Sequence, residues 1–235
     1  MNELIQILSG GSLISDGRAN EVADRVLANP ELFDQLEEGL SESDPVIRAR
    51  TAHAVERISR THPEMLTGLL PKFIEMAIHD PVPMVKWHLA MIFGNLPLSA
   101  ESVDEIILVL FRMLEDASIF VKSWAMVSLT VLGRQHTSFR KVIADHIRPL
   151  QKDRSVAIQS KAIKAVKILE NDAELIPAGW IKQRDRANNN DQNKHHLNKE
   201  GSGGCAGGSA ARTPPIFPFF LRSYQNNSKN KHRWH

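Results

Sequence analysis

Apolar residues in the first 176 positions recur at helical spacing in four segments that align without gaps. The segments begin at Ile47, Val85, Val121 and Ile158, so that successive starts lie 38, 36 and 37 residues apart. Within each segment, apolar or small residues stand at offsets 0, 4 or 5, 8 and 11 from the first residue. These offsets trace one stripe of an α-helix, so the pattern predicts one amphipathic helix in each copy of an internal repeat.

A further helix precedes each of these four in the sequence. The apolar pattern predicts these first helices over 30–40, 63–78, 103–114 and 139–150. Asn29 before Pro30 is typical of a helix start, whereas Pro71 and Pro149 fall inside the predicted spans and are expected to kink or restart the turn. No stretch shows sustained two-residue alternation, so no strand is predicted. The unit is a helical hairpin of about 37 residues, and residues 1–28 predict a degenerate N-terminal cap.

An acidic residue precedes each second helix, and a basic residue follows in the first turn of that helix in the first three copies. The pairs are Glu42 and Arg48, Asp80 and Lys86, and Asp116 and Lys122, with Asp153 and Gln159 in the last copy. Together with the apolar stripe, this pattern resembles the HEAT repeat over about residues 28–170, and the chain resembles short, stand-alone bacterial HEAT-repeat proteins. The resemblance implies a right-handed α-solenoid of about four repeats, whose second helices line the concave surface. It also implies that the acid and base residues form a ladder between neighbouring repeats.

Charge is distributed unevenly behind a formal net value of +2. Residues 1–133 carry 10 Lys+Arg against 19 Asp+Glu, whereas residues 134–167 carry nine against two. Residues 168–176 add three acids, and residues 177–235 carry 10 Lys+Arg against three acids. A solenoid over residues 1–176 is therefore acidic overall and basic in its last repeat. The Asn runs and the Gly cluster predict that residues 177–235 form a disordered tail, whose composition also suits a non-native extension.

Composition also limits the compartment and the chemistry. Cys205 is the only cysteine, so the chain has no intrachain disulfide and no Cys-based zinc site. The start has an acid, Glu3, where a signal peptide would be basic, and the longest apolar runs are far shorter than the roughly 18 residues of a membrane span. We therefore expect a cytoplasmic protein, a monomer that does not bind membranes.

Motifs of catalysis and cofactor binding are absent from the sequence. No phosphate-binding loop, dinucleotide-binding glycine pattern, nucleophile elbow or HExxH pair is present, and no two histidines of the repeat region stand four residues apart. We therefore expect no enzyme activity, no metal and no cofactor. Two enzyme classes of HEAT-like fold stay open as less favoured alternatives. A DNA glycosylase of this fold needs a concave carboxylate, and the offsets of the second helices that are expected to be exposed hold only Glu56. A phycobilin lyase needs a bilin pocket, which nothing in the sequence marks.

The concave surface is the candidate binding face. If offsets 0, 4, 8 and 11 face the core, then offsets 3 and 6, with their neighbours, face the concave side. The residues so placed are Arg50, His53, Arg57, Trp87, His88, Met91, Trp124, Val127, Lys161 and Lys164. The centre of this set is aromatic and apolar and its ends are basic, which is typical of a protein interface. Trp87 and Trp124 are interpreted either as exposed anchors or as packing between repeats.

The sequence therefore predicts a non-catalytic scaffold that binds another protein on its concave face. The basic last repeat suggests an alternative, in which it binds an acidic protein or a nucleic acid. The net charge of −5 over residues 1–176 weighs against nucleic acid.

Overall fold

The computed structural model describes residues 2–180, and this part of the chain contains helices and no strands. The α-helices are α1 (Glu3–Leu8), α2 (Ala19–Ala28), α3 (Phe33–Glu38), α4 (Pro45–Ser59), α5 (Leu70–His79), α6 (Pro83–Asn95), α7 (Ala100–Met113), α8 (Ile119–Gln135), α9 (Arg140–Ile147) and α10 (Val156–Glu170). The predicted tail, apart from residues 177–180, lies outside the described residues. The all-α class predicted from the sequence is confirmed.

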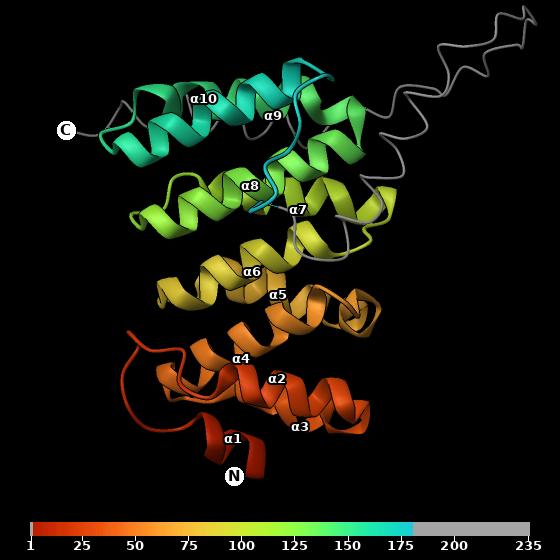
Figure 1. The fold of residues 1–235 in the computed structure, drawn as a ribbon, viewed down its shortest axis with the longest axis vertical. Helices are drawn as coiled ribbons and strands as arrows, with labels where there is room; N and C mark the ends of the chain where they lie inside the picture. The colour runs from red at the N-terminus through yellow and green to blue at the C-terminus, as the bar shows by residue number, and fades with distance from the viewer. Residues whose placement is uncertain (1, 181–235) are drawn as a thin grey trace, which may run out of the picture. The chain divides into compact units, whose positions relative to one another are not determined.

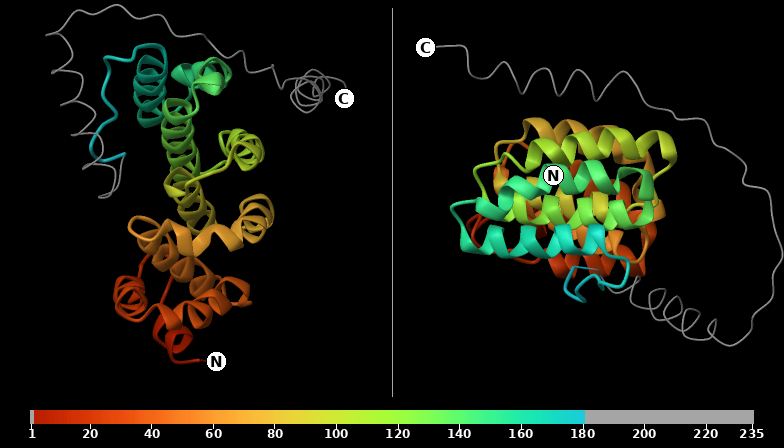
Figure 2. Two further views of the ribbon diagram at one scale, coloured as in Figure 1. Left: turned by 90° about the vertical axis from the view of Figure 1, so that its right-hand side faces the viewer. Right: turned by 90° about the horizontal axis from the view of Figure 1, so that it is seen from above.

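The helices stack in two layers along one axis. Helices α2, α4, α6, α8 and α10 pack side by side in that order, and α5, α7 and α9 form a second layer behind them (Figure 1). Seen from the side, the hairpins succeed one another from the N-terminal end to α10 (Figure 2). This arrangement is an α-solenoid, as the repeat pattern predicts.

The predicted stripe forms the core of the solenoid. The apolar residues at offsets 0, 8 and 11 are buried in all four repeats, and none of them is more than 4% exposed. Offset 5 differs, because Ala52, Ala90 and Met126 are fully buried whereas Ile163 in α10 is 54% exposed. Among the described residues no helix follows α10, so the side chain that would pack on the next repeat remains at the surface.

The prolines inside the first helices interrupt them as expected. Residues 63–69 form a 3₁₀ helix, and α5 begins at Leu70 with Pro71 in its first turn. Helix α9 ends at Ile147, and Pro149 lies in the 3₁₀ turn that follows. Neither proline lies in the interior of an α-helix, so the missing N–H of proline does not cost an α-helical hydrogen bond at either position.

An aspartate before each of the last three second helices links neighbouring repeats. Asp80 accepts a hydrogen bond from the backbone N–H of Val82 through Oδ1, at 2.8 Å, and pairs through Oδ2 with Arg48 of the preceding repeat, also at 2.8 Å. The next two links of this aspartate ladder join Lys86 to Asp116 at 2.9 Å and Lys122 to Asp153 at 3.0 Å. Each carboxylate thus caps its own loop and holds a cation from the repeat before it.

The ladder has different chemistry at its two ends. Glu42 enters it through its backbone carbonyl, which accepts a hydrogen bond from Nη1 of Arg48 at 2.9 Å. Gln159, which takes the basic position in the last repeat, turns back and donates from Nε2 to the carbonyl of Asp153 at 2.6 Å. Arg48 therefore reaches forward to the next repeat, whereas Gln159 bonds within its own.

Titration of Asp153, the last carboxylate of the ladder, tests this geometry. The N–H of Ser155, and after it the ammonium of Lys122, lower the pKa of Asp153. Because the pKa is lower in the folded chain, the stabilisation is present above the unfolded-state value and is lost as pH falls through the folded-state value. We expect a carboxyl carbon titration by NMR to give a midpoint below the usual value of about 3.9.

Removing the cation is expected to raise this midpoint only in part. The Lys122→Met variant keeps the N–H of Ser155, which is the larger cause of the lowered pKa. Lys164→Met removes the same charge from an exposed position of α10 and is expected to leave the midpoint unchanged. A midpoint in Lys122→Met equal to that of the wild type would show that the ion pair does not form in solution.

Candidate protein-binding face

The second helices present one surface away from the layer of α5, α7 and α9, and we call this surface the front face. It faces the viewer in Figure 1 and comprises offsets −1, 2, 3, 6 and 10 of α4, α6, α8 and α10. These offsets fall on one side of an α-helix, roughly opposite the buried stripe. Two segments of the same chain, residues 9–17 and residues 171–180, lie against its two ends.

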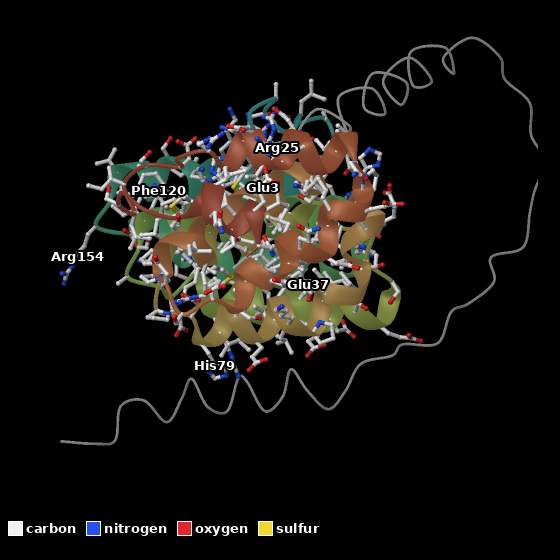
Figure 3. All side chains as sticks on the ribbon, turned by 90° about the horizontal axis from the view of Figure 1, so that it is seen from below. Glu3, Arg25, Glu37, His79, Phe120 and Arg154 are labelled. Atoms are coloured by element: carbon white, nitrogen blue, oxygen red, sulfur yellow. The ribbon has the colours of Figure 1, made fainter. Side chains whose placement is uncertain are left out.

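Aromatic side chains occupy the middle of the front face. Trp87 of α6 and Phe120 of α8 have ring centroids 5.0 Å apart, and Trp87, like Trp124 of α8, is partly exposed. Phe120 is 61% exposed and its neighbour Ile119 is 49% exposed. Figure 3 places Phe120 at one edge of the molecule, where α8 begins. An aromatic cluster of Trp87, Phe120 and Trp124 is thus accessible on two adjacent second helices.

Three predicted binding residues are buried, which corrects the sequence analysis. His88 is 6% exposed, Met91 7% and Val127 2%. The Nδ1 of His88 lies 2.7 Å from the carbonyl of Met84, and its Nε2 accepts a hydrogen bond from Nε1 of Trp87 at 3.3 Å. Helices α4, α6 and α8 pack so closely that His88 at offset 3, and Met91 and Val127 at offset 6, fill the seams between them instead of lining an open surface.

His53 shows how this seam is formed. Its ring is 4.8 Å from the ring of His88, so offset 6 of α4 meets offset 3 of α6. Burial lowers the pKa of His53, because the charged imidazolium loses hydration there. The neutral form of His53 is therefore favoured at pH 7, and His53 is a packing residue with a partly exposed edge.

Arg50 is buried as well, and its role is structural. It is 5% exposed, and its guanidinium donates to the carbonyls of Leu8 at 2.8 Å and Gly10 at 2.6 Å. Longer hydrogen bonds reach the carbonyls of Ser9, Ser12 and Ser15. Arg50 therefore holds the loop between α1 and α2 against α4 and is not available to a partner.

The remaining charged groups of α4 are paired. Arg57 forms an ion pair with Asp24 of α2 at 2.9 Å. Glu56, the one carboxylate considered for base excision, is fully buried, and both of its oxygens accept hydrogen bonds from Arg60. A buried carboxylate neutralised by a guanidinium is not presented to a ligand, so the expectation that Glu56 is exposed is wrong.

The C-terminal end of the front face combines two lysines with two indoles. The Nζ of Lys161 lies 5.4 Å from the ring centroid of Trp124 and 5.7 Å from that of Trp180. Burial lowers the pKa of Lys161, although both rings also offer its ammonium a favourable cation–π contact. Lys164, one turn further along α10, is exposed.

Acids of the same chain neutralise much of the basic last repeat. Arg140 pairs with Asp172 at 2.6 Å, Arg148 with Glu170 at 2.8 Å, and Lys167 with Glu174. Arg154, by contrast, reaches outward from the body of the molecule in Figure 3. The net charge counted along the sequence therefore overstates the positive field that this repeat presents.

Within residues 2–180, no three His, Cys, Asp or Glu side chains gather closely enough to hold a metal ion. No helix in this part of the chain combines the length and the apolar character that a membrane crossing requires.

The chain matches no protein-family model and no curated protein. Two solved structures, both designed armadillo repeat proteins, are similar to it. One is in complex with the peptide (KR)4; it is 16% identical, with a TM-score of 0.53 over 71% of this chain and 80% of that chain. The other is 16% identical, with a TM-score of 0.50 and the same coverage. The fold is a helical-repeat solenoid. It is related to the HEAT fold, while membership of the HEAT family stays a prediction.

Two residues of the front face, Phe120 and Trp180, were not predicted from the sequence. Phe120 stands at offset −1, which follows from the same helical geometry as offsets 3 and 6 but was not included in the predicted surface. Trp180 lies four residues beyond the predicted domain boundary at 176, in a stretch whose composition gives no signal of order. A helical-wheel projection would have found Phe120, whereas only the structure brings Trp180 to Lys161.

Proposed function

We propose that this chain is a non-catalytic scaffold that binds a partner protein on the front face of its second helices. The observation that carries the proposal is the aromatic cluster of Trp87, Phe120 and Trp124. Large aromatic side chains are common energetic anchors of protein interfaces. The exposed Phe120 contacts the ring of Trp87 and stands one helical turn before Trp124 on α8, and this arrangement leaves apolar area uncovered.

The similar solenoids support the same proposal. One of the designed armadillo repeat proteins is in complex with a peptide. Stacked helical hairpins present a row of equivalent positions, and an extended segment can contact them one repeat after another. Among the predicted concave residues, Trp87, Trp124, Lys161 and Lys164 remain candidates for partner contact, and Phe120 joins them.

The nucleic-acid alternative has less support than a protein partner. Five of the nine basic residues between 134 and 167 form ion pairs with acids of the same chain. The chain's own acidic segment against this repeat favours the other alternative, an acidic protein partner.

Site-specific photo-crosslinking tests the proposal in the native cell. We expect a benzophenone side chain at Phe120 or Lys164 to form an adduct with one partner, because both positions are exposed on the front face. The matched control is Asp104, which is also exposed but lies on α7 in the other layer, and it is expected to form no adduct. The Trp124→Ala substitution is expected to abolish the Lys164 adduct while the helical circular dichroism stays unchanged. The same adduct from Asp104 and Phe120 would contradict the proposal.

A further inference from the structure

The chain after α10 turns back and lies over its own front face. Residues 171–180 leave the end of α10 and run past α10 toward α8 on the side away from α7 (Figures 1 and 2). Trp180 is the last residue of this segment, and the ammonium of Lys161 lies 5.7 Å from its ring centroid and 5.4 Å from that of the α8 residue Trp124. The segment thus lies over the C-terminal end of the face that we propose for partner binding.

The segment contains turns at residues 172–173 and 178–180, and its contacts to the solenoid come from backbone carbonyls, carboxylates and one ring. Arg134 donates to the carbonyls of Asn171 and Asp172, at 3.2 and 3.1 Å. The carboxylate of Asp172 pairs with Arg140, and that of Glu174 pairs with Lys167. The solenoid therefore binds the segment through its backbone carbonyls, two of its carboxylates and one of its aromatic rings.

The charges of the two sides are complementary. Residues 168–176 contain three acids and no base, whereas residues 134–167 contain nine bases and two acids. A surface that is both basic and partly aromatic selects against basic and purely apolar segments, because either would leave cations unpaired. The segment therefore reports which peptide chemistry this end of the front face accepts.

The segment covers the surface without being part of the core. Leu175 is 65% exposed, and Ala173, Ala178 and Gly179 are exposed too. The core residues of α10, such as Ile158, Ala162 and Ile168, are fully buried against other helices. Release of residues 171–180 would consequently break exposed ion pairs and one cation–π contact while leaving the packing of α10 in place.

We propose that residues 171–180 are an intramolecular occupant of the front face, which a short acidic segment of a partner protein, carrying an aromatic side chain, displaces. This inference rests on the proposed function and names the chemistry of the partner. The chain would thereby weaken its own binding, because a short tether gives its segment an effective concentration of order millimolar.

The test measures binding of a fluorescent peptide with the sequence of residues 171–180 to the full chain. We expect Glu174→Gln/Trp180→Ala to bind it at least about tenfold more tightly than the wild type, since the tethered competitor is weakened. Leu175→Ala, which alters an exposed residue of the same segment, is the matched control and should bind as the wild type does. Adding Lys161→Glu to the double variant should abolish binding, and so should replacing both acids of the peptide with lysine.

Equal affinity of the wild type and the double variant, or no binding by either, would overturn the inference. Fluorine NMR of the chain labelled with 5-fluorotryptophan provides a second measurement. Lys161→Met is expected to shift the resonances of both Trp124 and Trp180, and the absence of both shifts would also overturn the inference.

Crosslinking separates the inference from the proposed function. An adduct from Phe120 that is equal in the wild type and the double variant supports the scaffold function and contradicts displacement of residues 171–180. Absence of any front-face adduct, with peptide binding as expected, contradicts only the scaffold function.

Discussion

Replacing Arg50 with methionine is expected to lower the free energy of unfolding by about 3 kcal/mol, because several charge-assisted hydrogen bonds to backbone carbonyls are lost together. The guanidinium bonds the carbonyls of Leu8 and Gly10 most closely, at 2.8 and 2.6 Å. Leu8 is the last residue of α1, so Arg50 also meets the negative end of that helix. Methionine preserves much of the side-chain volume but supplies no donor.

Urea denaturation measures the loss, and amide hydrogen exchange locates it. Exchange is expected to rise in residues 3–17 before it rises in α6 or α8. Arg57→Met is the matched control, since Arg57 lies on the same helix and holds only a partly exposed ion pair to Asp24. Its expected cost is below about 1 kcal/mol. Equal losses in the two variants would contradict the structural role of Arg50.

Gly17 supports the same anchor from the loop side. Its φ is +55°, a conformation that favours glycine, and a Cβ there would come within 2.6 Å of the guanidinium carbon of Arg50. The loop is therefore shaped around the arginine, and the arginine is held by the loop. This mutual fit explains why a cationic side chain is buried in a predicted binding row.

Substitution of Gly94 by alanine is expected to destabilise the middle of the stack by about 1–3 kcal/mol, the usual cost of overpacking. A Cβ at this position would lie 2.7 Å from Oγ and 3.3 Å from the backbone Cα of Ser128 on α8. The hydroxyl of Ser128 already donates to the carbonyl of Ala90 at 2.6 Å, so it cannot turn away without breaking that bond. The overlap therefore outweighs the helix propensity that alanine gains over glycine, which is about 1 kcal/mol.

Thermal unfolding of matched variants tests this expectation. Gly68→Ala is the control, because a Cβ there meets no atom within 4 Å. It is expected to leave the melting temperature unchanged or to raise it slightly. A second substitution, Ser128→Gly, is expected to restore part of the stability of Gly94→Ala. If Gly94→Ala melts at or above the wild-type temperature, α6 and α8 are not as closely packed as the structure has them.

The helical stack could be predicted from the sequence because one apolar stripe recurs in four copies. Burial of the residues at offsets 0, 8 and 11 follows from periodicity alone. The positions of Pro71 and Pro149 likewise predict where the first helices change between α-helix and 3₁₀ helix. The sequence predicts that acidic and basic residues pair between neighbouring repeats. It does not predict that each base pairs with the aspartate of the following repeat, because the distance from Arg48 to Asp80 depends on the rotation between successive hairpins.

The binding face could be predicted only in part. Helical periodicity gives the direction of a side chain from its own axis, and it says nothing about how close the neighbouring helix lies. His88 and Val127 point toward the predicted side and are buried all the same, because α4, α6 and α8 lie in contact. Trp124 and Lys161 remained accessible enough to hold residues 171–180, a contact between distant parts of the sequence that local patterns do not encode.

The inward turn of Gln159 has a consequence for cooperativity. In a linear array, unfolding of one unit spreads to the next in proportion to the coupling energy across their junction. Each aspartate of the ladder adds an electrostatic contribution to that coupling. The last repeat has no cation for a following repeat, because Gln159 takes the basic position and bonds to Asp153 of its own unit. A duplicated hairpin grafted after α10 would therefore be coupled by apolar contact alone, and a lysine at position 159 would be the substitution that lets the array be lengthened by design.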